Sequence, residues 1–94
     1  MRYKVNTEKS VLKDLRKLEP SLQNKVLAIF SSLEKSPLLG QKLSGPLSRF
    51  YSYHLKYKSI GYRIAYEIDT KNGRVIILLV DKRESFYKKL ARKF

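Results

Sequence analysis

Apolar residues in the first third of the chain follow a period of two and then the period of a helix. Polar and apolar residues alternate over residues 2–6, which predicts a short strand with Tyr3 and Val5 toward the core. Thr7 can cap a helix that stops at Glu19-Pro20, and its apolar stripe consists of Val11, Leu12, Leu15 and Leu18. A second helix is predicted from Pro20 to just before Ser36-Pro37, and its stripe consists of Leu22, Val26, Ile29, Phe30 and Leu33. We expect the two helices to pair and to cover one face of a sheet.

From Phe50 onward the pattern has a period of two. One face of the first strand carries Tyr51, Tyr53, Leu55 and Tyr57, and the other carries Ser52, His54, Lys56 and Lys58. After a turn at residues 59–61, a second strand has Tyr62, Ile64, Tyr66 and Ile68 on one face, with Arg63, Ala65 and Glu67 on the other. Asn72-Gly73 predicts a hairpin turn, and the apolar run 75–80 predicts a strand that is covered on both faces.

The remaining segments complete the predicted fold. Residues 37–48 hold two prolines, two glycines and four leucines, which is typical of a loop pinned by a few apolar side chains. Residues 84–94 predict a last basic helix that carries Phe86, Leu90 and Phe94. We therefore expect residues 1–94 to form a single α+β domain in the order β-α-α-β-β-β-α. It would have a small antiparallel sheet, the helical pair on one face and polar side chains on the other.

The charge of the chain indicates a polyanionic partner. Its 94 residues include 21 Lys and Arg against 8 Asp and Glu, a net charge of +13, which opposes compaction and exceeds what solubility requires. Nucleic acid, an acidic membrane surface and an acidic protein are all compatible with this charge. No apolar run reaches the about 20 residues that cross a bilayer, and the first residues do not read as a signal peptide, so we expect a cytoplasmic protein.

The polar face of the predicted sheet is the place where chemistry is expected. Two strands contribute Ser52, His54, Lys56, Lys58 and Arg63 to this face. Lys82 and Arg83 follow the last strand, and Tyr87 comes about one helical turn later. We predict that an RNA phosphodiester lies among these groups, with Ser52, Lys56, Lys58 and Lys82 as RNA contacts and His54, Arg63, Arg83 and Tyr87 as the catalytic set.

Metal-free cleavage of RNA needs a base for the 2'-hydroxyl, cations for the phosphorane and an acid for the leaving oxygen. His54 has the one side chain whose ordinary pKa is near neutrality, and a lysine of lowered pKa is the alternative base. Arg63 and Arg83 suit bidentate phosphate contacts, and Tyr87 can stack on a base. Each residue also has a plainer interpretation: a structural histidine, solvated lysines, surface salt bridges to Glu67 or Glu84, or a core tyrosine.

Other chemistries lack their residues. Without cysteine, disulfides, zinc knuckles and thiol catalysis are excluded. The carboxylates are too dispersed for a two-metal nuclease, so no metal site is expected; they are Glu8, Asp14, Glu19, Glu34, Glu67, Asp69, Asp81 and Glu84. No phosphate-binding glycine loop is present, and Ser52 beside His54 has no carboxylate in place to complete a triad.

Three segments together resemble the RelE family of bacterial and archaeal toxins. They are Gly61-Tyr62-Arg63-Ile64-Ala65-Tyr66 after a basic strand, Lys82-Arg83-Glu84-Ser85-Phe86-Tyr87 after an apolar strand, and Lys42-Leu43-Ser44-Gly45 in the loop. With the early helical pair, the resemblance covers nearly the whole chain. It implies a microbial-RNase-like fold and the toxin of a type II toxin–antitoxin module, acting without cofactors as a ribosome-dependent endoribonuclease on mRNA that leaves a 2',3'-cyclic phosphate.

The resemblance also implies roles for single residues. Arg63 is similar to the arginine that holds the scissile phosphate, Arg83 to the one that stabilises charge or protonates the leaving group, and Tyr87 to the aromatic residue that stacks on a base. Lys56 resembles a further phosphate contact. The strand that supplies the base departs from the RelE pattern, because Ser52 and His54 stand where RelE has two lysines. His54 is then the expected replacement.

The partners implied are the ribosome with its mRNA and a cognate antitoxin, whose acidic or apolar segment would cover this surface or displace the last helix. Two alternatives remain open. The ParE branch of the superfamily inhibits DNA gyrase, and a catalytically weak chain would be an RNA-binding module only.

Overall fold

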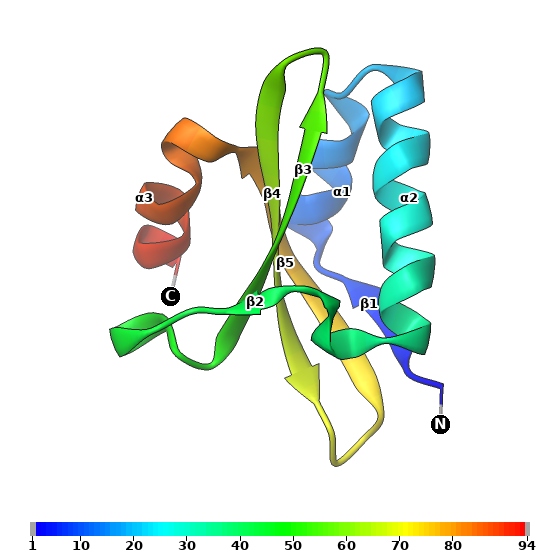
Figure 1. Ribbon diagram of the computed structural model, residues 1–94, viewed down its shortest axis with the longest axis vertical. Helices are drawn as coiled ribbons and strands as arrows, with labels where there is room; N and C mark the ends of the chain where they lie inside the picture. Colours follow the sequence, from blue (N-terminus) through cyan, green and yellow to red (C-terminus); the bar gives the residue numbers. More distant parts are fainter. Residues whose placement is uncertain (1, 94) are drawn as a thin grey trace.

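The computed structural model describes residues 2–93, which form a five-stranded sheet with helices on both faces (Figure 1). Strand β1 (Lys4–Thr7) is followed by helices α1 (Lys9–Arg16) and α2 (Pro20–Lys35). The short strand β2 (Gln41–Lys42) lies between two 3₁₀ turns, Pro37–Leu39 and Gly45–Leu47. Strands β3 (Phe50–Tyr57), β4 (Ile60–Asp69) and β5 (Arg74–Lys82) follow, and α3 (Arg83–Lys93) ends the chain. The element order agrees with the predicted α+β fold, with β2 added.

The sheet is mixed rather than purely antiparallel, which corrects the sequence-based expectation. Its strand order is β1-β5-β4-β3-β2, and β1 pairs with β5 in parallel, with Val5 opposite Val75. The helical pair carries the chain away from β1, so β1 meets β5 only after about 70 residues, and no local pattern shows this pairing. Two backbone amides on the outer side of β1 and of the residue before it are bonded as well: Tyr3 donates to the Glu34 carbonyl and Val5 to the Glu34 carboxylate. Helix α2 therefore closes this edge of the sheet.

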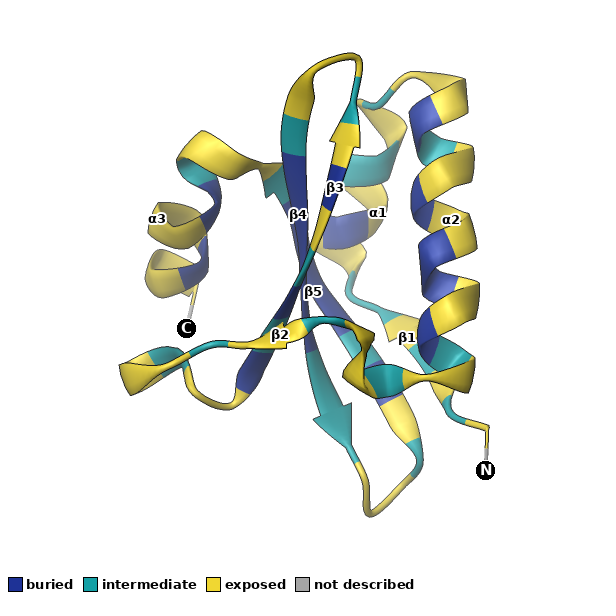
Figure 2. Cartoon of the chain, viewed as in Figure 1, coloured by how far each residue is buried: buried dark blue, intermediate teal, exposed yellow. Residues whose placement is uncertain are grey.

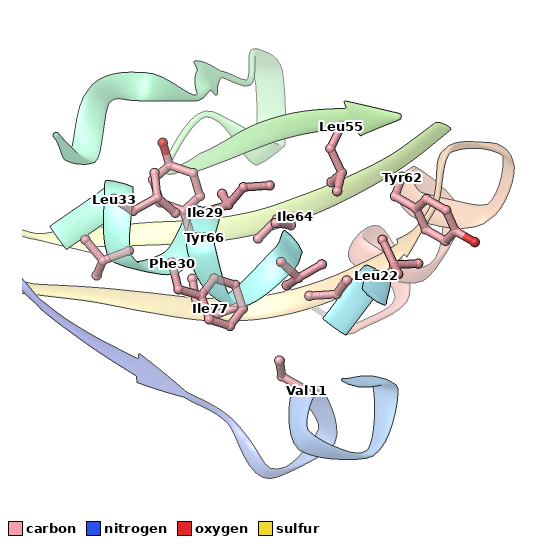
Figure 3. Packing of buried hydrophobic residues seen from close by; sticks show 13 residues of the cluster. Val11, Leu22, Ile29, Phe30, Leu33, Leu55, Tyr62, Ile64, Tyr66 and Ile77 are labelled. Carbon is pink, nitrogen blue, oxygen red and sulfur yellow. The ribbon is translucent and has the colours of Figure 1, made fainter. Parts of the chain in front are cut away.

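The main core lies between the helical pair and the sheet. The predicted stripe of α2 is buried against Leu55, Tyr62, Ile64, Tyr66 and Ile77 from the strands (Figure 3). Val11 is the buried residue of α1, whereas Leu12 is 43% exposed, so its predicted place in the core is wrong. Tyr3, Val5, Leu15 and Leu18 pack at the margin of the core. The alternating apolar face of the sheet is thus the one that the helices cover, as predicted.

A second, smaller core lies on the opposite face, under α3. It contains Phe50, Ala65, Leu78, Leu79, Phe86 and Leu90, and Figure 2 shows the buried side of α3 turned toward the sheet. A register shift between Ala65 and Tyr66 makes Leu78 an extra residue in β5. Leu78 and Leu79 consequently both face α3. The apolar run 75–80 is covered on both faces, as predicted. The face of the sheet opposite the helical pair was expected to be polar, but it is polar only where α3 does not cover it.

Three local predictions change in detail. The residue before α1 is Glu8 rather than Thr7, and it makes no side-chain cap. The hairpin between β3 and β4 turns at Lys58-Ser59, so Gly61 lies within β4. In the last hairpin only Gly73 has a positive φ, at 65°. The predicted contact of Phe94 falls outside residues 2–93. Within that range, no helix combines the length and the hydropathy needed to span a bilayer.

The hairpin at Lys58-Ser59 offers a test of backbone strain. Both residues have positive φ, 50° and 67°, as two-residue hairpins require, yet neither is glycine or asparagine. Ser59→Gly is expected to raise the free energy of unfolding by about 0.5–1 kcal/mol, because glycine tolerates this region. The matched change Gly73→Ser, at φ 65°, is expected to lower it by a similar amount. Urea denaturation measures both; a loss of stability in Ser59→Gly would contradict the explanation.

Candidate RNA-cleavage site

A basic cavity opens where β4, the end of β5 and the start of α3 meet. Its volume is about 580 Å³, and its lining consists of Ser59, Ile60, Gly61, Arg63, Lys82, Arg83, Glu84 and Tyr87. Three of these side chains are cationic and one is a carboxylate. Helix α3 lies over one face of the sheet (Figure 1), and its first residues supply Arg83, Glu84 and Tyr87 to this lining. We call it the arginine cavity.

Arg63 is the centre of this site. It is buried, with 9% of its surface exposed, and one guanidinium nitrogen contacts both His54 Nε2 at 2.5 Å and the Tyr87 hydroxyl at 2.7 Å. The guanidinium carbon is 5.1 Å from the centroid of the Tyr87 ring. His54 is directly opposite Arg63 in the β3–β4 ladder, so the two side chains share a face. The sheet register and the first turn of α3 thus bring the three residues together.

His54 is held in its neutral form. An arginine only donates hydrogen bonds, so Nε2 of His54 must accept, and the ring proton is then on Nδ1. Partial burial lowers the pKa of His54, and the positive charges of Arg63 and Arg83 lower it further. The ring is otherwise exposed. A neutral, accessible imidazole beside two arginines has the properties of a general base at neutral pH.

Arg83 is the first residue of α3 and lines the arginine cavity together with Arg63. The side chain passes over Gly61, where an added methyl group would lie 3.6 Å from the Arg83 β-carbon. A larger residue at position 61 would therefore narrow the arginine cavity. Arg83 is exposed, and both arginines line the same cavity, so two guanidinium groups are available to one phosphate.

Asp81 fixes the turn from β5 into α3, a role that sequence reasoning missed. Its carboxylate accepts from the backbone of Lys82 and the hydroxyl of Ser85, and it pairs with Lys89 at 2.8 Å. Burial works to raise the pKa of Asp81, but the three hydrogen bonds and the Lys89 charge together lower it. Asp81 lies opposite Arg63 in the ladder and yet is bound to α3. The charge of Arg63 is thereby left available to a ligand.

The four predicted RNA contacts differ in exposure and in their place on the sheet. Lys56 is exposed, opposite Gly61 and on the face of the arginine cavity, whereas Ser52 is 1% exposed and cannot meet RNA in this structure. Ser52 is buried because Gln41 and Ala65 flank it on the face that α3 covers.

Lys58 turns to the other side of the sheet, because it lies in the hairpin and pairs with Glu19 at 3.0 Å. That contact, with the hydrogen bonds from Tyr57 and Lys58, lowers the pKa of Glu19. Lys82 is opposite Tyr62 and lines both the arginine cavity and a second cavity of about 410 Å³ beside the helical pair. Its position suits a phosphate at the edge of the site. The structure thus corrects the predicted exposure of Ser52 and the predicted face of Lys58, while Lys56 and Lys82 have accessible positions.

Comparisons with known proteins agree with this fold. Residues 5–91 match the family described as ParE-like toxin of type II bacterial toxin–antitoxin system. The chain is 31% identical over 90 residues to Toxin RelG of Mycobacterium tuberculosis, covering 95% of this chain and 100% of that one. It is 32% identical to a chain of the toxin–antitoxin complex RelBE2 from M. tuberculosis, with a TM-score of 0.78, covering 88% and 100% of the two chains. A free mutant of E. coli toxin RelE has a TM-score of 0.77 at 21% identity, over 100% of both chains, and shows the shared fold.

A match over almost the entire length shows that the chain belongs to this family, the toxins of type II toxin–antitoxin systems. Within the RelE/ParE superfamily it is of the RelE type. Among residues 2–93, no three or more His, Asp or Glu side chains gather in a way that would hold a metal ion.

Proposed function

We propose that this toxin is a metal-independent endoribonuclease that cuts mRNA on the ribosome. The observation that carries the proposal is the position of Arg63, which contacts His54 and Tyr87 and shares the arginine cavity with Arg83. Two of the needs of cleavage through the 2'-hydroxyl, a neutral base and a pair of cations, have side chains here, and the aromatic ring of Tyr87 can bind a base of the RNA.

The roles follow from the chemistry of the side chains. The scissile phosphate accepts hydrogen bonds from Arg63 and Arg83, and Arg63 then exchanges its contact with His54 for one with a phosphate oxygen. The freed Nε2 of His54 takes the proton of the 2'-hydroxyl, and that oxygen attacks phosphorus. Arg83 stabilises the charge that develops and hydrogen-bonds the departing 5'-oxygen, which takes a proton from solvent water as the P–O5' bond breaks, and His54 returns its proton to solvent. The upstream fragment ends in a 2',3'-cyclic phosphate, and Tyr87 stacks on a neighbouring base.

The direct test is to add the purified toxin to a translating extract and to map the ends of a reporter mRNA. Fragments with 2',3'-cyclic phosphate ends, formed only while ribosomes translate, are expected. Cleavage of ribosome-free RNA at the same rate would contradict the proposed dependence on the ribosome. RNA binding without any new ends would instead leave the chain as an RNA-binding module.

Gyrase inhibition is the second candidate, because the matching family carries the description ParE-like. The His54, Arg63, Arg83 and Tyr87 cluster favours the nuclease, since a gyrase inhibitor has no need of a neutral base beside two arginines. A supercoiling assay run beside the mRNA assay separates the two functions. Inhibited supercoiling with intact mRNA would reverse the assignment.

We further propose a cognate antitoxin as the partner that controls the toxin. The relative with 32% identity is described in a toxin–antitoxin complex, and the net charge of +13 suits an acidic binding segment.

The pKa of His54 gives a prediction that does not depend on turnover. His54 is the single histidine of the chain, so NMR follows its titration directly. We expect a pKa below about 6.5, the ordinary value, because burial and the charges of Arg63 and Arg83 disfavour the imidazolium. The base is then neutral at pH 7, and cleavage is lost only as the pH falls through this lowered pKa.

Arg83→Gln removes one of the two neighbouring charges, so the pKa of His54 is expected to rise. Arg92→Gln on the outer side of α3 is the matched control and should leave it unchanged. Equal pKa values in the wild type and Arg83→Gln would contradict the electrostatic coupling.

A further inference from the structure

A third cavity, distinct from the one beside the helical pair, adjoins the arginine cavity at Tyr87. Its volume is about 410 Å³, and Gln41, Lys42, Leu43, Ser44, Leu47 and Tyr87 line it. Tyr87 lines both cavities, so the two adjoin at this side chain. The volume falls within the about 300–1,000 Å³ that is typical of small-ligand sites.

We call this cavity the Gln41 pocket. Its floor is apolar and aromatic. Leu43 and Leu47 pack against the core under α3. The Tyr87 ring, 43% exposed, is fixed by an edge-to-face contact with Phe86, at 5.1 Å between centroids, and by the hydrogen bond from Arg63. Such a floor suits the flat, apolar face of a nucleobase.

The rim of the pocket carries polar side chains that have no hydrogen-bond partner among residues 2–93. Gln41 is opposite Ser52 in the β2–β3 ladder and therefore shares a face with His54 and Arg63. Its side chain is exposed and, like that of Ser44, makes no hydrogen bond within residues 2–93. An amide offers one donor and one acceptor side by side, which is the pattern needed to pair with a base edge.

The segment that carries Gln41 is anchored to the core. The hydroxyl of the buried Tyr66 accepts from the backbone of Gly40 at 2.8 Å and donates to the carbonyl of Pro37 at 2.7 Å. A β-carbon at Gly40 would stand 2.5 Å from that hydroxyl oxygen, so only glycine fits. The backbone of Leu43 donates to Phe50 on the other side of Gln41. The backbone of Gln41 is thus held in place before any ligand binds, as is required of a residue that recognises a base.

We propose that the Gln41 pocket binds a nucleobase of the RNA whose phosphate lies in the arginine cavity, with adenine preferred and Gln41 as the reading residue. The proposal rests on the proposed function, because it assumes that RNA occupies the arginine cavity. Glutamine pairs with adenine through two hydrogen bonds, to N6 and N7. Adenine offers a donor beside an acceptor on both of its exposed edges, cytosine on one only, and a purine covers more of the Tyr87 ring.

The test uses binding of the four nucleoside 5'-monophosphates to the full chain, followed by NMR. The wild type is expected to bind AMP roughly fivefold or more tightly than CMP or UMP, with shifts in the Gln41 side-chain amide and in Tyr87. Gln41→Ala should remove this preference and leave binding of inorganic phosphate unchanged. Arg83→Gln is the converse control: it should weaken all four nucleotides alike. Gln41 is exposed, so the fold is expected to tolerate its replacement.

Two results would overturn the inference. Equal binding of the four nucleotides would refute the proposed base pocket. An AMP preference that persists in Gln41→Ala would refute the role of Gln41 in it. A guanine preference would count against Gln41 as well, because the N7 and O6 edge of guanine offers two acceptors that suit Lys42 instead. No ribosome or cleavage enters this measurement. A toxin that cuts mRNA without the AMP preference refutes the pocket alone, and one that shows the preference without cutting refutes the nuclease alone.

Discussion

Arg63→Lys is expected to slow the cleavage of translated mRNA by at least about a hundredfold, the loss that follows removal of one fixed donor to a developing anion. The arginine contacts His54 and Tyr87 through one nitrogen and still has further donors for the phosphate. Lysine keeps the charge but presents a single point donor on a stem of different reach. It cannot make these contacts together. The measurement is the rate at which cleaved ends appear in the translating extract.

Arg74→Lys is the matched control for Arg63→Lys. Arg74 lies at the start of β5 and pairs with Asp69 at 3.0 Å, far along the sheet from the arginine cavity. The same chemical change there is expected to leave cleavage unaltered. Urea denaturation of both variants shows whether the fold persists. A well-folded Arg63→Lys that cuts as fast as the wild type would remove Arg63 from the chemistry.

His54→Gln tests the second large effect, the loss of the base. Removal of a positioned base is expected to slow cleavage by about a hundredfold to ten-thousandfold. Glutamine can still accept the hydrogen bond from Arg63 through its carbonyl oxygen, but it takes up no proton at neutral pH. We therefore expect His54→Gln to be as inactive as His54→Ala.

The two variants separate a chemical role from a positioning role. If His54 served only to orient Arg63, His54→Gln would recover most of the activity that His54→Ala loses. The pH profile adds an independent readout. The acid limb that the histidine gives to the wild type should be absent from whatever activity remains in either variant.

Sequence patterns predicted the parts of the fold that rest on local periodicity. The stripe of α2 and the alternation of β3 and β4 each follow from neighbouring residues, and the alternation already placed His54 and Arg63 on one face. The parallel pairing of Val5 with Val75 depends on contacts far apart in the sequence. The extra residue in β5 is equally invisible, because a run of Val, Ile and Leu has no register of its own.

The sequence predicted which residue types form the site, but it did not predict which of them are exposed on the same surface. Ser52 follows the polar alternation and was expected to meet RNA, yet α3 and the loop before β3 cover that part of the face. Lys58 continues the same alternation but falls in the hairpin, where its positive φ turns it toward Glu19. Asp81 and Gln41 carried no motif. Their importance comes from what the fold brings beside them, the first turn of α3 and the ring of Tyr87.

The anchoring of α3 by Asp81 has a consequence for experiments at low pH. Because its pKa is lowered in the folded protein, Asp81 stabilises the fold at any pH above the ordinary aspartate value of about 3.9. That contribution is lost only as the pH drops further, through the lowered value. At any pH above about 3.9 the last helix therefore keeps its anchor, and a fall in cutting as the pH drops through the lowered pKa of His54 reports on one ring nitrogen rather than on a loosened α3.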